Sequence, residues 1–464
     1  MGTLSEEILS RKAGRPVHAG EILVVDLDLV MSHDTTTPLA MEAFYGLTHR
    51  EPDQAPALQD SAPERLKVPD KIRIYPTPAS REVRPQAGMG NLSGVLSGRV
   101  FDRSRVVIAF DHIVPAATIQ AATLQRDIRR FAREQDLLHV YQEGVGHQII
   151  MEKGFVVPGD VVVGADSHTC TYGALGAFAT GMGSTDIGVA YATGQTWFRV
   201  PETVAIRLVG EFPPGVFAKD AIMSIVGMLG ADGASNYAVE FLGETVERMT
   251  QSERFTLSNM AIEMGAEVGL IAPDATTEEY LRPRTERSFD LMQPQAPQYW
   301  REMVVDVSRL EPQIACPPDV DHVVPLNVVE GLKIDQIFLG TCSNGRIEDL
   351  AIAADILRGQ QVYPDTRMVV VPASREVYLE ALRRGYIETF TEAGALVEAA
   401  SCGPCIGRHQ GVLSAGERAL TTMNRNFTGR MGDPTAEIYL GSPATIAASA
   451  ITGVITDPRS YFAA

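Results

Sequence analysis

Short apolar runs rich in valine and isoleucine alternate along this chain with longer stretches that have helical periodicity. Such runs, of about four to eight residues each, are typical of βαβ units in which helices cover a buried parallel sheet. The pattern therefore predicts an α/β fold. We expect strands within residues 21–29, 105–110, 160–164, 333–340, 367–372 and 395–400.

The chain of 464 residues is long enough for about three domains of ordinary size. We expect α/β domains at 1–200, 201–320 and 321–464, because residues 201–316 carry fewer chemically reactive side chains and Cys316-Pro-Pro is typical of a linker. The stretch at about 49–100 is rich in Pro, Ala, Gln and charged residues. We expect it to be an insertion that is loop or partly disordered.

The charge balance narrows the class of partner. The chain has 40 basic and 58 acidic side chains, a formal net charge of −18, which argues against nucleic acid or an anionic membrane as the partner. No apolar run is long enough for a transmembrane helix, and the polar start lacks the order of a signal peptide. Five cysteines, an odd number, do not suggest a disulfide framework. We therefore expect a cytoplasmic protein, or one in a comparably reducing compartment.

Several expected strands are followed at once by residues that can do chemistry. The carboxyl ends of parallel strands meet at one edge of a sheet, where ligands bind, so these residues are expected to share one composite site. In chain order they are Asp111 and His112; Asp166, Ser167 and His168; Cys342; and Cys402 with Cys405.

The cysteines give the first indication of a cofactor. Cys342 stands alone, and Cys402-Gly-Pro-Cys405 supplies a close pair, so three cysteines are present where a closed metal site uses four ligands. A site with an open position can hold a substrate on the metal. The pattern favours an iron-sulfur enzyme.

Two other interpretations of these cysteines remain open. Cys-Gly-Pro-Cys is also the redox motif of thioredoxin-like proteins, although here it lies near the end of a long chain and follows Ser401 rather than a tryptophan. A zinc site could take His409 or Cys316 as its fourth ligand, although structural zinc sites usually draw their ligands from two close pairs. Cys170 and Cys316 have no partner at ligand spacing, and we expect them to be ordinary packed or partly exposed cysteines.

Three of the nine histidines are candidates for proton transfer. His112 follows Asp111 directly and His168 follows Asp166 by two, and a carboxylate next to an imidazole raises its basicity. His147 has no obvious local partner, and the sequence does not decide its role. We expect the following histidines to be structural or exposed: His18, His49, His139 and His322.

Arg425 and Arg430 flank Gly429 and could clamp carboxylates, which lysine does less well. The alternative is two solvated surface arginines. A bound nucleotide is not expected, because Asp186 stands where a dinucleotide-binding fingerprint needs its third glycine and the chain contains no Gly-Lys dipeptide for a phosphate-binding loop.

Taken together, these motifs resemble the aconitase superfamily, most closely the large subunits of its isopropylmalate dehydratases. The resemblance covers nearly the whole chain except the insertion. It rests on Phe110-Asp-His112, Gly164-Ala-Asp-Ser-His-Thr169, Asn259-Met-Ala-Ile-Glu263, Gly340-Thr-Cys-Ser-Asn-Gly345, Cys402-Gly-Pro-Cys405 and Asn424-Arg-Asn-Phe-Thr-Gly-Arg430.

The resemblance implies three α/β/α domains around a cleft, with the swivel domain of single-chain aconitases absent from this chain. A small swivel-domain subunit would then complete the site with a serine base and a further arginine. It also implies a 4Fe-4S cluster on Cys342, Cys402 and Cys405. Acid-base and orienting pairs would be Asp111 with His112, Asp166 with His168, and His147 with Glu263. Substrate would be bound by Ser167, Asn259, Asn424, Arg425 and Arg430.

The implied reaction removes water from a hydroxy acid and adds it back at the neighbouring carbon, here between 2-isopropylmalate and 3-isopropylmalate in leucine biosynthesis. Two alternatives stay open. One is homoaconitase or another dicarboxylate hydro-lyase, and the other is a non-enzymatic iron-sulfur or zinc-binding protein. The insertion at about 49–100 is longer than the family leads us to expect, and the sequence gives it no role.

Overall fold

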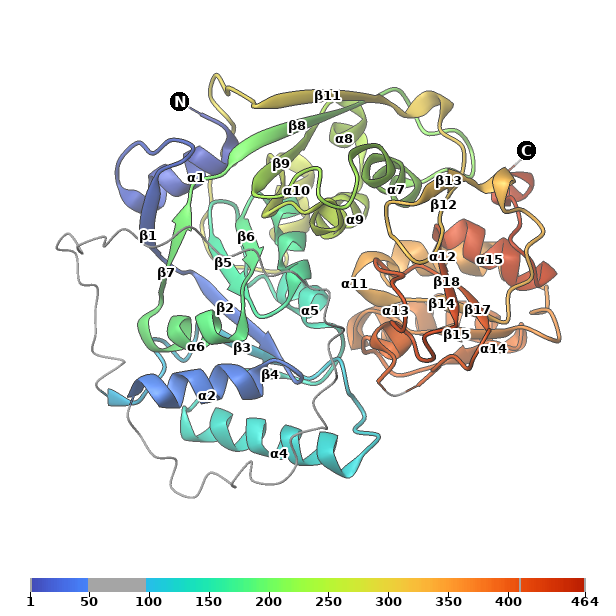
Figure 1. Cartoon of the computed structure of the whole chain (residues 1–464), viewed down its shortest axis with the longest axis horizontal. Helices are drawn as coiled ribbons and strands as arrows, with labels where there is room; N and C mark the ends of the chain where they lie inside the picture. Colours follow the sequence, from blue (N-terminus) through green and yellow to red (C-terminus); the bar gives the residue numbers. More distant parts are fainter. Residues whose placement is uncertain (1, 49–96, 409, 463–464) are drawn as a thin grey trace.

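The computed structural model describes residues 2–48, 97–408 and 410–462. The expected insertion lies, up to residue 96, outside the described residues, as does His409. Helices cover sheets made almost wholly of parallel strands, so the predicted α/β class is confirmed. The N-terminal and C-terminal parts of the chain occupy opposite ends of the molecule, with the middle part packed against both (Figure 1).

The first sheet has five parallel strands in the order β4-β3-β2-β5-β6. Their bounds are β2 Leu29–His33, β3 Val106–Ala109, β4 His139–Tyr141, β5 Val161–Gly164 and β6 Phe178–Gly181. Helices α2 (Thr37–Thr48), α4 (Ile119–Glu134) and α6 (Ser184–Thr193) lie together beside it (Figure 1). They meet through the buried rings of Phe44, Phe131 and Tyr191. The described residues of this part also form α1 Leu4–Ala13, α5 Gly146–Glu152 and the 3-10 helix η1 Ser167–Leu175.

The second sheet has four parallel strands in the order β10-β9-β8-β11. The strands are β8 Glu202–Val209, β9 Tyr237–Leu242, β10 Val268–Ile271 and β11 Arg301–Asp306. The helices around them are α7 Ala218–Leu229, α8 Glu244–Arg248, α9 Gln251–Asn259, η2 Met260–Met264, α10 Ala275–Leu281 and η3 Val307–Arg309.

The third sheet has seven strands in the order β13-β12-β18-β17-β14-β15-β16, and only β12 pairs antiparallel with its neighbours. The strands are β12 Gln313–Ala315, β13 Val323–Pro325, β14 Gln336–Leu339, β15 Arg367–Val370, β16 Leu396–Val397, β17 Arg418–Thr421 and β18 Glu437–Leu440. The helices are η4 Leu326–Val328, α11 Thr341–Asn344, α12 Ile347–Leu357, α13 Arg375–Arg383, α14 Tyr386–Glu392, η5 Gly403–Ile406, α15 Pro443–Thr452 and η6 Pro458–Tyr461. The domain limits expected near residues 200 and 320 stay predictions.

The apolar run at 21–29 does not form the single strand that its composition suggested. Residues Ile22–Asp26 form β1, which alternates exposed and buried positions and pairs antiparallel with β7 (Gln195–Arg199) outside the main sheet. The chain then turns, and only at Leu29 does β2 enter the first sheet, where all five of its residues are buried. The expected strand was therefore wrong in its bounds, and the end of β2 at His33 was missed.

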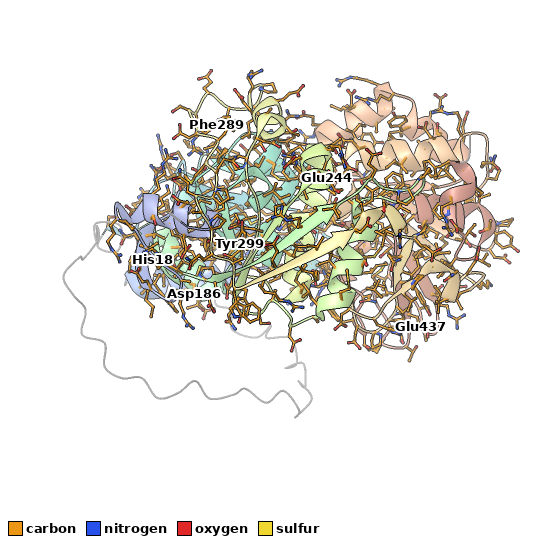
Figure 2. The ribbon with its side chains drawn as sticks, turned by 90° about the horizontal axis from the view of Figure 1, so that it is seen from above. His18, Asp186, Glu244, Phe289, Tyr299 and Glu437 are labelled. Carbon is orange, nitrogen blue, oxygen red and sulfur yellow. The ribbon has the colours of Figure 1, made fainter. Side chains whose placement is uncertain are left out.

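The described residues include no helix that is both long and apolar enough to cross a membrane. His18, which we expected to be unremarkable, is exposed and lies toward the opposite end of the molecule from Glu437 (Figure 2). His139 packs edge-on against the ring of Phe155. Both fit the expectation of a structural or exposed histidine.

Backbone hydrogen bonds join the first sheet to the third at their loop ends. The amide of Cys402 donates to the carbonyl of Asp111 (2.8 Å), and the amide of Val145 donates to the carbonyl of Ala373 (2.8 Å). The loops after β3 and β16 therefore face one another, which sets the position of the site described below.

A buried carboxyl anchors the N-terminus to the second sheet and makes stability depend on pH. Glu240 on β9 accepts hydrogen bonds from the Leu4 amide (2.6 Å) and the Tyr299 hydroxyl (3.1 Å). Burial raises the pKa of Glu240 from 4.5 to about 7. Between these values the folded chain binds more protons than the unfolded chain, so the free energy of unfolding falls as pH rises through this window. Above about pH 7 Glu240 is ionised in both the folded and the unfolded chain, and the free energy of unfolding falls no further on its account.

We therefore expect Glu240→Gln to flatten this decline. From pH 5 to pH 8 the wild type should lose about 2 kcal/mol more of its unfolding free energy than the variant, because one pKa unit corresponds to about 1.4 kcal/mol. Denaturant melts at several pH values measure this, with the exposed Glu388→Gln as the matched control. Parallel curves for the wild type and Glu240→Gln would contradict the assignment.

Candidate active site

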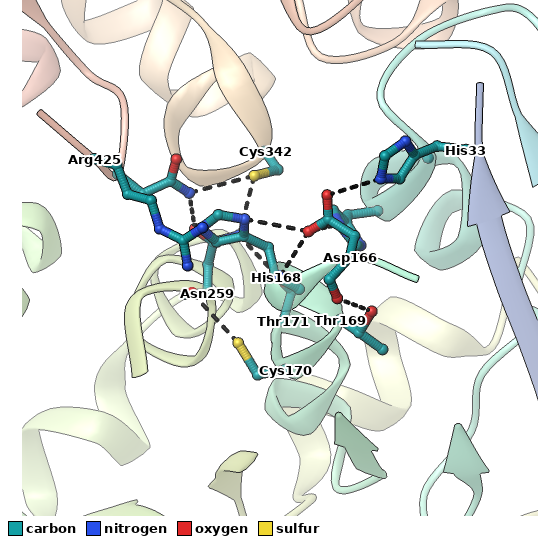
Figure 3. A network of polar contacts seen from close by, with 12 residues as sticks. His33, Asp166, His168, Thr169, Cys170, Thr171, Asn259, Cys342 and Arg425 are labelled. Carbon is teal, nitrogen blue, oxygen red and sulfur yellow. Dashed lines mark hydrogen bonds and ion pairs between the residues drawn. The ribbon is translucent and has the colours of Figure 1, made fainter. Parts of the chain in front are cut away.

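The candidate site forms where loops of the first and third sheets meet, and it includes the 3-10 helices η1 and η2. The structure brings together the residues that follow β3, β5 and β14, as expected from the carboxyl ends of parallel strands. Figure 3 shows this network from close by, with Asp166, His168, Asn259, Cys342 and Arg425 among its labelled members.

Asp166 is the centre of the polar network. Its Oδ1 lies 3.1 Å from His147 Nε2 and 3.3 Å from His168 Nδ1. Its Oδ2 lies 3.3 Å from His33 Nε2 and 3.6 Å from His112 Nε2. Burial raises the pKa of Asp166, but the charges and hydrogen bonds of these imidazoles, His147 first, hold that pKa well below its ordinary value. One carboxylate therefore stays ionised among four imidazoles.

The local sequence explains how Asp166 comes to point into the site. It caps the N-terminus of η1, where its Oδ1 accepts a hydrogen bond from the His168 amide (2.7 Å). The neighbouring strand β6 ends at Gly181, where a Cβ atom would lie 2.6 Å from the Asp166 carbonyl oxygen. The glycine thus permits the close approach that lets the Asp166 loop fold over the strand.

Asp111 and His112 form the expected carboxylate-imidazole pair. His112 Nδ1 donates to Asp111 Oδ1 (2.7 Å), and the other carboxylate oxygen accepts from the Gly146 amide (2.8 Å). Burial lowers the pKa of His112, but the charge and hydrogen bond of Asp111 outweigh it and raise that pKa to about 9. His112 can therefore carry a proton on Nε2 at neutral pH, as a general acid requires.

His33 is a member of the site that the sequence analysis did not single out. The Thr35 amide donates to its Nδ1 (3.4 Å), so that Nε2 carries the hydrogen that faces Asp166. Its ring stacks on that of His112, with centroids 3.9 Å apart and an interplanar angle of 21°. The available clue was His33-Asp34 itself, an imidazole and a carboxyl in sequence at the end of a strand. The following Asp34 accepts from the amides of His112 and Ile113.

The expected pairing of His147 with Glu263 is wrong. Glu263 accepts from His168 Nε2 (2.8 Å) and from Arg425 Nε (3.0 Å), and these contacts hold its pKa below the ordinary value despite burial. His147 instead contacts the Tyr172 hydroxyl through Nδ1 (2.9 Å) and faces Asp166 through Nε2. The reason is that η1 places His168, rather than His147, against η2. His168 thus bridges Asp166 and Glu263, while His147 has Tyr172 as its second partner.

The three motif cysteines are buried, free of disulfides and close to the network. Cys402 Sγ lies 3.9 Å from His112 Nδ1. Cys342 Sγ accepts from Asn259 Nδ2 (3.2 Å) and Asn424 Nδ2 (3.5 Å). Amide donors to sulfur stabilise the thiolate form that a metal ligand requires.

The donor set fits a metal cluster. Burial raises the pKa of the Cys342 thiol to about 12 and that of Cys402 well above its ordinary value, and the charges of the neighbouring cysteines raise both further. These buried, unpaired thiols can serve as ligands, because metal ligation replaces the thiol protons. Arg430 adds a donor, with Nη2 3.5 Å from Cys405 Sγ. Cys342, Cys402 and Cys405 would hold the group.

The structure separates Cys316 from these three cysteines. Cys316 belongs to the apolar core beneath α12 and α15, whereas Cys342, Cys402 and Cys405 share the core that joins the three sheets. It is therefore poorly placed as a fourth zinc ligand. The Cys402-Gly-Pro-Cys405 motif leads into the short helix η5, not a long helix of the thioredoxin type. Cys170 is buried, and its thiol donates to the Asn259 carbonyl (3.4 Å).

The remaining expected residues border the same network. Asn259 and Asn424 join directly, since Asn424 Nδ2 donates to Asn259 Oδ1 (2.6 Å). Arg425 is about three-quarters buried and uses Nε on Glu263, and the described residues make no hydrogen bond to its Nη atoms. Arg430 lies over the half-exposed ring of Phe427. Ser167, at the start of η1, is partly exposed.

Comparison with known proteins agrees with this geometry. The sequence model described as the aconitase family (aconitate hydratase) matches residues 6–453. A 3-isopropylmalate dehydratase large subunit 1 of Methanopyrus kandleri is 46% identical over 99% of both chains. In Methanothermobacter thermautotrophicus, a probable methanogen homoaconitase large subunit is 47% identical over 98% of this chain and 97% of its own. A probable 3-isopropylmalate dehydratase large subunit of the same organism is 47% identical over 99% of both chains. The chain therefore belongs to the aconitase family.

Proposed function

We propose that this chain is the large subunit of a 3-isopropylmalate dehydratase. In this proposal it isomerises 2-isopropylmalate and 3-isopropylmalate by loss and return of water, as a step of leucine biosynthesis. It holds a 4Fe-4S cluster on Cys342, Cys402 and Cys405 and acts together with a small subunit. The names of relatives 41–47% identical to this chain support both the reaction and the pairing with a small subunit.

One observation carries the proposal. Three buried, unpaired cysteines lie beside a proton-carrying network, with Cys402 Sγ 3.9 Å from the ring of His112. A redox or structural metal site has no need of a protonated imidazole and an ionised carboxylate next to its sulfurs. A hydro-lyase needs both groups. The imidazole protonates the departing hydroxyl, and the carboxylate keeps the surrounding imidazoles in place.

The cluster, when bound, supplies a Lewis acid with an open coordination position that weakens a carbon-oxygen bond. The chain's own residues supply the proton chemistry. Asp111 orients His112 through Nδ1, which leaves the Nε2 proton available for the departing hydroxyl. Asp166 holds the neighbouring imidazoles with their Nε2 or Nδ1 atoms toward its carboxylate.

Substrate carboxylates are proposed to bind at Arg425 and Arg430. Arg425 is fixed by Glu263 through Nε alone, so its terminal guanidinium nitrogens can form the two-pronged contact that carboxylates favour. Arg430 is held over Phe427 and beside Cys405, which places a second cation at the same edge. Ser167, Asn259 and Asn424 are proposed to add neutral polar contacts.

A base is not evident among the residues that the structure describes in this network. The carboxylates of Asp111, Asp166 and Glu263 are each already held by imidazole or guanidinium groups. We propose that the small subunit supplies the base and a further substrate-binding arginine. Substrate choice would then depend on both chains.

The second candidate function is that of a homoaconitase large subunit, favoured by the 47% identical relative of that name. Assays of the full chain, loaded with iron and sulfide anaerobically and mixed with its small subunit, decide between them. We expect isopropylmalate to be turned over with a kcat/KM at least about tenfold above that for homocitrate, since loss of a fitting apolar group costs about 1–3 kcal/mol.

The opposite ratio would assign the homoaconitase function and leave the hydro-lyase chemistry in place. Failure of the chain to bind iron under these conditions, with all three cysteines intact, would overturn the proposal as a whole. Because an open iron site reacts with oxygen, turnover should also be lost in air.

A further inference from the structure

Lys219 is a buried lysine that joins two separate parts of the candidate site. It lies in the first turn of α7, beside the second sheet, and is 1% exposed. Its Nζ donates to the carbonyls of Thr422 (2.9 Å) and Met423 (2.8 Å) and lies 3.3 Å from Ser343 Oγ. Ser343 follows Cys342, and Met423 precedes Asn424. The lysine thus ties together the two loops whose side chains meet at the Cys342 sulfur.

The contacts of Lys219 fit a charged ammonium that lacks a carboxylate partner. An ammonium has three N–H donors and no acceptor, and the three oxygens around Nζ match that count. Among the described residues, no carboxylate lies within ion-pair distance of it. A buried charge is normally paired, so an anion is expected nearby.

As a cluster ligand in the proposed function, Cys342 would supply that anion as a thiolate on the turn that Lys219 contacts. Burial lowers the pKa of Lys219 to about 7, and the charge of Cys342 is the largest of the charges that act in the opposite direction. The sulfur lies one residue from Ser343, which Lys219 contacts directly. Asp220, the next residue, is directed elsewhere, since it accepts from the amides of Phe217 and Gln313.

A second buried cation holds the same turn through other atoms. Arg346, 3% exposed, donates through Nη1 to the Cys342 carbonyl (2.7 Å) and through Nη2 to the Ser343 carbonyl. The turn needs such support because Thr341 has φ 80°, a conformation that is unfavourable for a β-branched residue. Lys219 and Arg346 therefore fix the backbone that presents Cys342.

We propose that Lys219 is a positioning residue that supplies the buried counter-charge for the Cys342 thiolate and, with Arg346, fixes the turn that presents this thiolate. The inference rests on the proposed function, in which Cys342 holds the cluster. Removing the charge leaves the loaded site, which is negatively charged overall, uncompensated in a buried environment, so the site loses iron more readily and accepts an electron less readily. If Lys219 acted only through its hydrogen bonds, its replacement would destabilise the fold without changing iron release or the midpoint potential.

The test compares Lys219→Gln and Lys219→Arg in the full chain after anaerobic loading with iron and sulfide. The glutamine amide can still donate to the two carbonyls but carries no charge, whereas arginine retains the charge. We expect Lys219→Gln to release iron to a chelator about tenfold faster than the wild type. We also expect its midpoint potential to fall by an amount equivalent to about a tenfold change in the oxidised-to-reduced ratio, or 59 mV for one electron.

Lys219→Arg should stay within about twofold of the wild type in both measurements. Asp220→Asn is the matched control, a buried change on the same turn of α7, and it should alter the melting temperature without altering the potential. Wild-type potential and iron release in Lys219→Gln would overturn the inference. A wild-type chain that takes up no iron would instead overturn the proposed function, so the two failures are distinguishable.

Discussion

Replacing Cys402 with serine is expected to abolish stable iron binding and to lower turnover by about 10³-fold or more, because a metal Lewis acid contributes several kcal/mol to the transition state. Serine is nearly the size of cysteine, and the Cys402 amide keeps its hydrogen bond to the Asp111 carbonyl. The loop should therefore hold its shape while one thiolate ligand is lost. Iron and acid-labile sulfide per chain, measured after anaerobic loading, and turnover with the small subunit report the two effects.

Cys316→Ser is the matched control, since Cys316 is equally buried in the same part of the chain but lies in a different apolar core. This variant should lose stability by about 1–2 kcal/mol, through burial of a hydroxyl, and keep its iron. Undiminished turnover of Cys402→Ser in the complex would contradict a catalytic role for the cluster. It would favour the alternative in which the cysteines serve only as a binding site.

The sequence could predict the parts of the site that follow from parallel strands. Asp111, Asp166 and Cys342 each come directly after a short run of buried apolar residues, and the structure ends β3, β5 and β14 just before them. The rule that strand ends meet at one edge was enough to expect a shared site. It required no knowledge of how the sheets pack.

The sequence could not give contacts that depend on how separate layers pack. Glu263 meets His168 and Arg425, which lie in distant parts of the chain, and no local pattern shows that His168 rather than His147 reaches it. His33 was missed for another reason. The apolar composition of 21–29 suggests a single strand despite Asp26 and Asp28, so the separate strand β2, which ends at His33, was not recognised.

The same packing explains why Asp166 occupies a special position. A buried carboxylate with two oxygens can hold several N–H donors at once, and the imidazoles of His33, His112, His147 and His168 all lie within 3.6 Å of it. Each imidazole has a second partner that fixes its other nitrogen, such as Asp111 for His112 or Tyr172 for His147. The ionised carboxylate therefore sets the tautomer of a whole group of rings, not of one.

Asp166→Asn should consequently lower kcat by about 10⁴-fold, the size of effect expected when a carboxylate that sets a catalytic tautomer becomes an amide. The asparagine side chain keeps one acceptor oxygen, but its NH₂ group faces at least one imidazole N–H, so that two donors meet. That ring must then rotate or change its tautomer. Iron content should stay near the wild-type value, because Asp166 makes no contact with the three cysteine sulfurs among the interactions of the described residues. Turnover and iron content together separate this effect from cluster loss.

Asp160→Asn provides the comparison needed to attribute that loss to tautomer control. The Asp160 side chain is 6% exposed, against 12% for that of Asp166, and Arg287 donates to both of its oxygens at 2.7–2.8 Å, but it lies at the other end of β5. Loss of this charge should cost about 1–3 kcal/mol of stability and leave kcat within about twofold. If Asp166→Asn retained more than a tenth of the wild-type kcat while Asp160→Asn behaved as stated, the four imidazoles would not depend on one carboxylate. The acid would then have to be positioned by Asp111 alone.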